Sequence, residues 1–210
     1  MAIRVVLADD HNLVRQGIRA LLERDKLQVV AEASDGQELA RLAQAEQPDI
    51  AVLDISMPTL NGIDAARELA RTCPKTKTIL LTQHEEEQYI HEALEAGVRG
   101  YVLKSQVAND LLHAIQQVSR GGFYLSPGVS RAVVEAYRSR SHRAADPLSD
   151  RERQVLQLIA EGKSTKDVAS LLGISVKTAE SHRSRLMQKL DIHETASLVR
   201  YAVRRGLVQP

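Results

Sequence analysis

Three carboxylates follow short apolar runs of the chain, where their negative charge can be concentrated. Asp9 and Asp10 come after residues 3–8, and Asp54 comes after residues 50–53. If the two runs are adjacent strands of a parallel sheet, all three acids lie at its carboxyl edge, where open α/β folds bind ligands. Two negative charges about 4 Å apart repel by roughly 4 kcal/mol at an effective dielectric constant near 20. Such a cluster requires a cation, and hard oxygen ligands that leave room for water suit Mg2+.

Two further polar side chains are expected at the same edge. Thr82 ends a fourth apolar run and Lys104 ends a fifth. A carboxylate beside a divalent metal favours phosphoryl chemistry, with Asp54 as the nucleophile while Asp9 and Asp10 hold the metal. Thr82 and Lys104 would then bind the oxygens of the incoming phosphoryl group.

The elements that must position these groups alternate along the chain. Five apolar runs rich in Val, Ile and Leu are too continuous to be half-exposed, which predicts buried parallel strands at residues 3–8, 27–33, 49–53, 77–82 and 99–103. Helical patterns lie between and after them at residues 12–23, 36–46, 62–72, 86–96 and 107–119. The alternation predicts an α/β doubly wound sheet of five parallel strands.

Composition narrows the class of protein. The 210 residues are 43% hydrophobic and 26% charged, enough for one large domain or two small ones. The sequence has no apolar stretch near the roughly 20 residues of a membrane span and no signal-peptide pattern, so we expect a cytoplasmic protein with no membrane partner. The single cysteine, Cys73, cannot form an internal disulfide, which fits a reducing compartment.

The charge and the pattern both change partway along the chain. Residues 1–119 carry 12 Lys and Arg against 18 Asp and Glu, whereas residues 146–210 carry 11 against 8, so only the later part can attract a polyanion. Glycines, a proline and a polar stretch mark residues 121–146 as a linker with a short helical pattern at 130–137. We therefore expect one domain at 1–120 and an all-α domain of four helices at 147–210.

The all-α domain contains a helix-turn-helix pattern. A short helix ends before Gly173, and Ser175 caps a longer helix over residues 176–190. One side of this longer helix is apolar, and the opposite polar side should enter the major groove of DNA. The candidate DNA contacts are Lys163, Ser164, Thr165, Lys166, Ser175, Lys177, Thr178, Ser181, His182, Ser184, Arg185 and Lys189.

The acidic cluster resembles the receiver domain of two-component response regulators. The resemblance covers about residues 1–120 and rests on Asp9-Asp10-His11, Asp54 with Met57-Pro58 and Gly62 behind it, Thr82, and Lys104 preceded by Tyr101. It implies a CheY-like fold and a sensor histidine kinase that phosphorylates Asp54. It also implies that the backbone carbonyl of Ser56 joins the carboxylates around Mg2+, and that Thr82 and Tyr101 act as the switch.

Two positions depart from the commoner receiver pattern. Gln83 follows the threonine, where a small residue is usual, and this leaves the lifetime of the phosphorylated state open. Ser105 follows the lysine, where many receivers have a proline, often after a cis peptide bond.

The C-terminal domain resembles the LuxR-type helix-turn-helix of NarL/FixJ response regulators. The shared strings between Leu148 and Asp191 are Leu-Ser-x-Arg-Glu, Gly-Lys-Ser-x-Lys, Ile-Ser-x-Lys-Thr and His-Arg. The resemblance implies promoter DNA as a partner and a homodimer on DNA, in which Leu198 and Ala202 of the last helix form the contact. Arg183 lies beside the apolar stripe of its helix, so we expect it to pair with Glu152 rather than with DNA.

The leading hypothesis is a DNA-binding transcription regulator controlled by Mg2+-dependent phosphorylation of Asp54, and not a turnover enzyme. Two alternatives stay open. The acidic cluster also suits an Mg2+-dependent hydrolase with an aspartyl-phosphate intermediate. A DNA-binding protein that works without phosphorylation would use the cluster only for stability.

Overall fold

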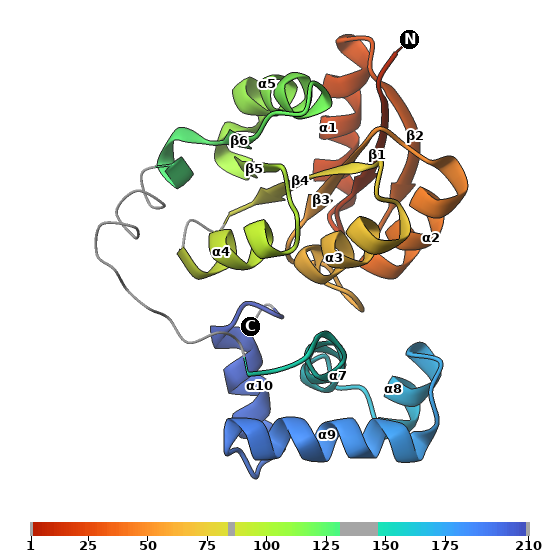
Figure 1. The fold of residues 1–210 in the computed structure, drawn as a ribbon, viewed down its shortest axis with the longest axis vertical. Coiled ribbons are helices and arrows are strands. Elements are labelled where there is room, and N and C mark those ends of the chain that lie inside the picture. Colours follow the sequence, from red (N-terminus) through yellow and green to blue (C-terminus); the bar gives the residue numbers. More distant parts are fainter. Residues whose placement is uncertain (1, 84–86, 131–146, 209–210) are drawn as a thin grey trace. The chain divides into compact units, whose positions relative to one another are not determined.

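The computed structural model describes residues 2–83, 87–130 and 147–208, which form an N-terminal α/β unit and a C-terminal helical unit (Figure 1). Each unit is described by itself. The helical pattern expected at residues 130–137 lies almost wholly outside the described residues. Among the helices that are described, none is both long and apolar enough to cross a bilayer.

A parallel sheet with the strand order β2-β1-β3-β4-β5-β6 forms the centre of the N-terminal unit. The five expected strands are β1 (Arg4–Ala8), β2 (Gln28–Ala33), β3 (Ile50–Asp54), β4 (Lys77–Thr82) and β5 (Gly100–Leu103). A sixth strand, β6 (Tyr124–Leu125), pairs with β5, so the prediction of five strands is wrong by one. Its two residues lie in the segment expected to be a linker, and a run that short carries no recognisable period.

Helices cover both faces of the sheet (Figure 1). The helices α1 (Asn12–Arg24) and α5 (Val107–Ser119) lie on one face. On the other face lie α2 (Gly36–Glu46), α3 (Gly62–Thr72) and α4 (Glu87–Glu95). A short 3-10 helix, η1 (Lys104–Gln106), leads from β5 into α5. These positions confirm the expected helices and the doubly wound arrangement.

The continuous apolar runs follow from burial on both faces. Val5, Leu7, Ile50 and Val52 form one core with side chains from α1 and α5. Because successive side chains of a strand point to opposite faces, the residues between them face α2, α3 and α4. All five residues of β3 and the last four of β1 are therefore buried, and these strands lack the alternation seen in half-exposed strands.

The strand β2 departs from this rule. The sequence predicts a buried strand here, but β2 is an edge strand of the sheet and most of its residues are only half-buried. Its Glu32 carboxylate reaches out to two arginines of α1, lying 2.6 Å from Arg19 Nη1 and 3.3 Å from Arg15 Nε. A charged residue on an edge strand is common, because it discourages pairing with other chains.

The C-terminal unit has the four expected helices, α7 (Asp150–Ala160), α8 (Thr165–Leu171), α9 (Val176–Leu190) and α10 (Thr195–Arg204). Serines cap the first three. Ser149 and Ser164 each form a reciprocal capping box with the acidic residue three positions later, and the Ser175 hydroxyl accepts a hydrogen bond from the amide of Thr178.

A single apolar core joins these helices. Leu156 of α7, Val168 of α8, Leu186 of α9 and Leu198 of α10 are among its fully buried members. Gly173 has a φ angle of 62°, a left-handed conformation that glycine adopts without a steric cost, and it turns the chain between α8 and α9. The helix-turn-helix arrangement expected from the sequence is therefore present.

Candidate functional site

The pairing of strands brings the first two acids together. Ala8 pairs with Leu53 in the parallel ladder between β1 and β3, so Asp9 and Asp54 follow side by side at the carboxyl ends of these strands. Both are buried, with exposed fractions of 0% and 3%. Asp10, one residue further along, is exposed to solvent.

The neighbouring strands deliver the remaining pocket residues. Thr82 is the last residue of β4 and is fully buried. It pairs with Leu103, and Lys104 comes directly after Leu103 at the start of η1. Tyr101, the expected second switch residue, is buried in β5. The bond between Lys104 and Ser105 is trans.

Lys104 bridges the two buried carboxylates. Its Nζ atom lies 2.7 Å from Asp54 Oδ2 and 2.8 Å from Asp9 Oδ2. Burial raises the pKa of Asp54, the charge and hydrogen bond of Lys104 lower it in part, and the charges of Asp9 and Asp10 raise it further, so that the net shift is upward. Burial alone would lower the pKa of Lys104, but the two carboxylates outweigh it and raise that pKa.

The acidic cluster has the donor set of a site for a hard divalent cation. Asp9, Asp10, His11 and Asp54 each offer one ligand atom, and these atoms all lie within 4.8 Å of one another. The amide of His11 donates to Asp9 Oδ1 over 2.8 Å, which fixes that carboxylate. Three carboxylates beside open solvent fit Mg2+, which retains several waters. The carbonyl of Ser56 as a further ligand stays a prediction.

Close packing behind Asp54 explains the glycine of the sequence pattern. A Cβ atom added to Gly62 would overlap the backbone oxygen of Asp54 and would lie 2.9 Å from its carbonyl carbon. The amide of Gly62 donates to the carbonyl of Ile55 over 2.9 Å. The first residue of α3 therefore lies directly against the strand end that carries Asp54.

Sequence reasoning missed one residue beside the pocket. Arg15 of α1 donates from Nη1 to the backbone oxygen of Asp9 over 2.7 Å, and its Nε atom lies 3.3 Å from Glu32. Arg15 thus ties the carboxyl end of β1 to β2. No local pattern could reveal this role, because it depends on the pairing of two strands that are distant in sequence.

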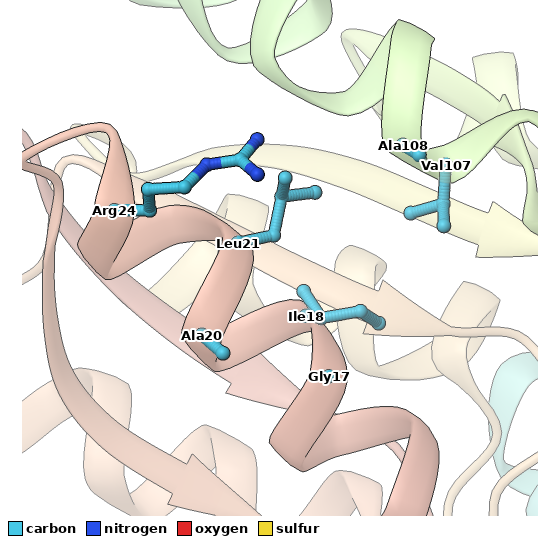
Figure 2. Close-up of a pocket in the computed structure, with 7 residues that line it drawn as sticks. All are labelled: Gly17, Ile18, Ala20, Leu21, Arg24, Val107 and Ala108. Atoms are coloured by element: carbon cyan, nitrogen blue, oxygen red, sulfur yellow. The ribbon is translucent and has the colours of Figure 1, made fainter.

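The pocket in Figure 2 is separate from the acidic cluster. It has a volume of about 410 Å³ and lies between α1 and α5. Its walls are mainly apolar, formed by residues such as Ile18, Leu21 and Val107, and Arg24 also lines it. It contains none of the predicted phosphoryl or metal ligands.

In the C-terminal unit, most of the candidate DNA contacts reach solvent. The exposed members are Lys163, Ser164, Lys166, Ser175, Lys177, Thr178, Ser184, Arg185 and Lys189, and the half-buried members are Thr165, Ser181 and His182. The hydroxyls of Ser164 and Ser175 already cap helices. A DNA contact from either serine would therefore be additional to a structural role.

The expected ion pair between Arg183 and Glu152 does not form. Lys189 takes that place, with its Nζ atom 2.6 Å from Glu152 Oε2. Arg183 instead donates to the hydroxyl of Thr195 over 2.9 Å. Lys189 lies one residue before the end of α9 and reaches back to the start of α7, so this candidate DNA contact also holds the two helices together.

The expected dimer contact needs a similar correction. Leu198 and Ala202 of α10 are fully buried in the core of the C-terminal unit, so neither side chain is available to a second copy. Residues one turn apart on a helix produce the same apolar stripe whether the stripe faces a core or a partner. The exposed positions of α10 are instead Thr195, Ala196, Arg200 and Arg204.

Together, the fold and the two sites define a class of protein: a doubly wound domain with a buried Asp-Asp-Lys cluster at its carboxyl edge, joined to a helix-turn-helix domain. The family model of the response regulator receiver domain matches residues 5–116. The model of the bacterial regulatory proteins of the luxR family matches residues 146–202.

Relatives of known annotation match almost the whole chain. The transcriptional regulatory protein MctR of Rhizobium johnstonii is 39% identical over 207 residues, covering 98% of this chain and 95% of the relative. The oxygen regulatory protein NreC of Staphylococcus carnosus is 35% identical over 215 residues, covering 98% and 99%. The chain belongs to the NarL/FixJ family of two-component response regulators.

Solved structures agree with this assignment. The response regulator RcsB of Salmonella typhimurium is 29% identical with a TM-score of 0.61, and the match covers 97% of this chain and 98% of that chain. The response regulator in an RcsB-DNA complex is 30% identical with the same TM-score, and the match covers 96% and 98%. The protein is thus a two-component transcription regulator with a receiver domain and a LuxR-type DNA-binding domain.

Proposed function

We propose that Asp54 accepts a phosphoryl group from a phosphohistidine of a sensor histidine kinase, in a reaction that requires Mg2+, and that this controls binding to promoter DNA. The observation that carries the proposal is the position of Lys104, whose ammonium group lies within 2.8 Å of both buried carboxylates. A cation placed between the nucleophile and a metal-binding acid is suited to the oxygens of a transferred phosphoryl group.

Each pocket residue has a role in the proposed reaction. An oxygen of Asp54 forms a bond to phosphorus while the bond from phosphorus to the imidazole nitrogen breaks, and the electron pair of that bond stays on the nitrogen. Lys104 and Thr82 bind the oxygens of the phosphoryl group. Asp9 and Asp10, with Asp54, would hold Mg2+, which supplies positive charge to the same oxygens.

One phosphoryl group per chain is expected, with no turnover of a small substrate, because the acceptor is a residue of the protein itself. The protein would then be a regulated switch rather than an enzyme. A location in the cytoplasm, where both a kinase domain and DNA are accessible, follows from this proposal.

Phosphorylation can be tested directly with a small donor. The full chain is incubated with acetyl phosphate and Mg2+, and its intact mass is measured. We expect wild type to gain the mass of one phosphoryl group, Asp54→Ala to gain none, and Asp25→Ala, which removes an exposed aspartate near the end of α1, to behave as wild type. An unmodified wild-type protein would count against the proposal.

The DNA part of the proposal rests on α9. Lys177, Ser184 and Arg185 are exposed along this helix, where they can contact base edges or phosphates. The solved RcsB structures include dimers bound to DNA, which supports a homodimer on promoter DNA for this family member. Because Leu198 and Ala202 are buried, the contact between copies would use other residues.

A further inference from the structure

The segment after α5 is attached to β5 by a short ladder of hydrogen bonds. The amide of Tyr124 donates to the carbonyl of Arg99 over 3.0 Å, and the amide of Ser126 donates to the carbonyl of Tyr101 over 3.0 Å. The next bond of the ladder uses a side chain, because the amide of Leu103 donates to Ser126 Oγ over 3.3 Å. The serine hydroxyl thus extends the pairing of β5 to its last residue.

The same hydroxyl has a second partner on α5. Ser126 Oγ donates to Asp110 Oδ2 over 2.7 Å, and Ser126 is fully buried. One hydroxyl can accept one hydrogen bond while it donates another, so both bonds form together. Tyr124 also bonds to Asp110, and burial together with this carboxylate raises the pKa of Tyr124 to about 12. Asp110 is therefore held by two side chains of the β6 segment.

These contacts enclose the segment that carries Lys104. Leu103 lies directly before Lys104, and Asp110 lies in the first turn of α5, directly after η1. Ser126 is therefore bonded to both ends of the stretch from residue 103 to residue 110. Within this stretch the side chain of Lys104 must span to Asp9 and Asp54, so small shifts of its backbone move the ammonium group.

We propose that Ser126 and Asp110 are positioning residues for Lys104, and that they act on phosphoryl transfer through its ammonium group. This inference rests on the proposed function of Asp54 and adds two residues to it. Neither residue touches the phosphoryl group. Their effect is to fix the backbone from which the lysine reaches the pocket.

The first test is the rate of phosphorylation of the full chain by acetyl phosphate and Mg2+. We expect Ser126→Ala to be slower by about tenfold, less than the hundredfold that a misplacement of about 1 Å can cost. Ser126→Thr keeps the hydroxyl and should restore most of the rate. The matched control is Ser130→Ala. Among the described residues, the Ser130 hydroxyl bonds to the carbonyls of Leu125 and Ser126, both over 3.3 Å, so this variant should not affect the rate.

A milder pair of variants covers the case in which Ser126→Ala does not fold. Asp110→Ala removes the acceptor from a half-buried site on α5 and should slow the reaction. Asp110→Asn keeps an oxygen that accepts from Ser126 and should react at nearly the wild-type rate. Equal rates for Asp110→Ala and wild type would overturn the inference.

A double-mutant comparison separates positioning from a general structural effect. If Ser126 acts through Lys104, then Lys104→Ala and the double variant Lys104→Ala/Ser126→Ala should react at the same residual rate. A further tenfold loss in the double variant would show that Ser126 acts by another route and would contradict the inference.

A readout without phosphorylation distinguishes the two proposals. The NMR signal of the Lys104 side chain should shift in Ser126→Ala and stay in place in Ser130→Ala. If wild type accepts no phosphoryl group but this shift occurs, the proposed function fails while the positioning holds. If wild type is phosphorylated and neither the signal nor the rate changes in Ser126→Ala, only the inference fails.

Discussion

At the scale of single residues, the pocket depends on a carboxylate that is costly to ionise. Asp54 is 3% exposed and lies near Asp9 and Asp10, and Lys104 opposes the resulting rise of its pKa. The nucleophile must nevertheless be ionised to attack phosphorus. The positive charge and the hydrogen bond of Lys104 favour the ionised form of Asp54 and so oppose the effect of burial.

The pKa of Asp54 can be measured by a carboxyl NMR titration in the absence of Mg2+. We expect a midpoint above the ordinary value of 3.8, because burial and the other two acids favour the neutral form. Lys104→Met should move the midpoint further up, since it removes the opposing charge. A midpoint at or below 3.8 in wild type would contradict this electrostatic account.

At the scale of elements, two glycines make a matched comparison. Gly62→Ala places a methyl group on the backbone of Asp54 and should destabilise the protein by about 1–3 kcal/mol despite the better helix propensity of alanine. A Cβ atom added to Gly17 in α1 meets no atom of the other described residues within 4 Å outside its own helix backbone, so Gly17→Ala should stabilise the protein by about 0.5–1 kcal/mol. Denaturant unfolding of both variants checks the two signs, and a neutral Gly62→Ala would refute the packing argument.

The ion pair between α7 and α9 predicts a pH dependence. Burial alone would raise the pKa of Glu152, but hydrogen bonds from Lys189 and Ser149 outweigh burial and lower it. Stability from a lowered carboxyl pKa is present above the unfolded value of 4.5 and is lost as the pH falls through the native value.

Lys189→Met should therefore lower the free energy of unfolding by about 1–2 kcal/mol at pH 7. The lost bond is a charged one to a buried carboxylate, but solvent screens it in part because the lysine is partly exposed. The difference from wild type should shrink in acid. Thermal unfolding at a series of pH values measures it, with Lys177→Met, exposed on the same helix, as the control. A cost that stays constant down to the acid limit would exclude the ion pair as its source.

Patterns of the sequence predicted those elements whose period is set by burial. The central strands were recognised because both of their faces are covered, and the helices of both units because their caps and stripes are local. The strand β6 was missed because its two residues are a strand only by pairing with β5. For the same reason the contacts of Arg15 and Ser126 could not be predicted from the sequence. The apolar stripe of Leu198 and Ala202 is visible in the sequence, but it packs into the core of its own unit and not against a second copy.

At the scale of the whole molecule, charge is divided between the two domains. The receiver region is acidic and the DNA-binding region is basic, so a polyanion should be attracted to the second and repelled by the first. The apparent net charge of +1 conceals this division. Binding to DNA should consequently depend strongly on salt.

The salt dependence gives a quantitative test. The logarithm of the DNA association constant should fall with the logarithm of the salt concentration by about 0.9 per phosphate neutralised. Lys177→Ala or Arg185→Ala should weaken binding, and the slope should become shallower by about 0.9 for each residue that contacts a phosphate. Lys75→Ala, an exposed lysine of the receiver, is the control. A slope near zero in wild type would rule out the electrostatic part of the proposal.

The short strand β6 also sets the shortest receiver fragment that should stay folded and soluble. A fragment that ends at residue 120 would contain the whole match to the receiver family, which stops at residue 116, but it would lack the bonds from Tyr124 and Ser126 to β5. In this fragment β5 would be an edge strand with unpaired backbone groups and apolar side chains, and such an edge is a template for aggregation. Ten further residues would keep that edge covered, so a fragment ending at residue 130 should remain monomeric where the shorter one precipitates.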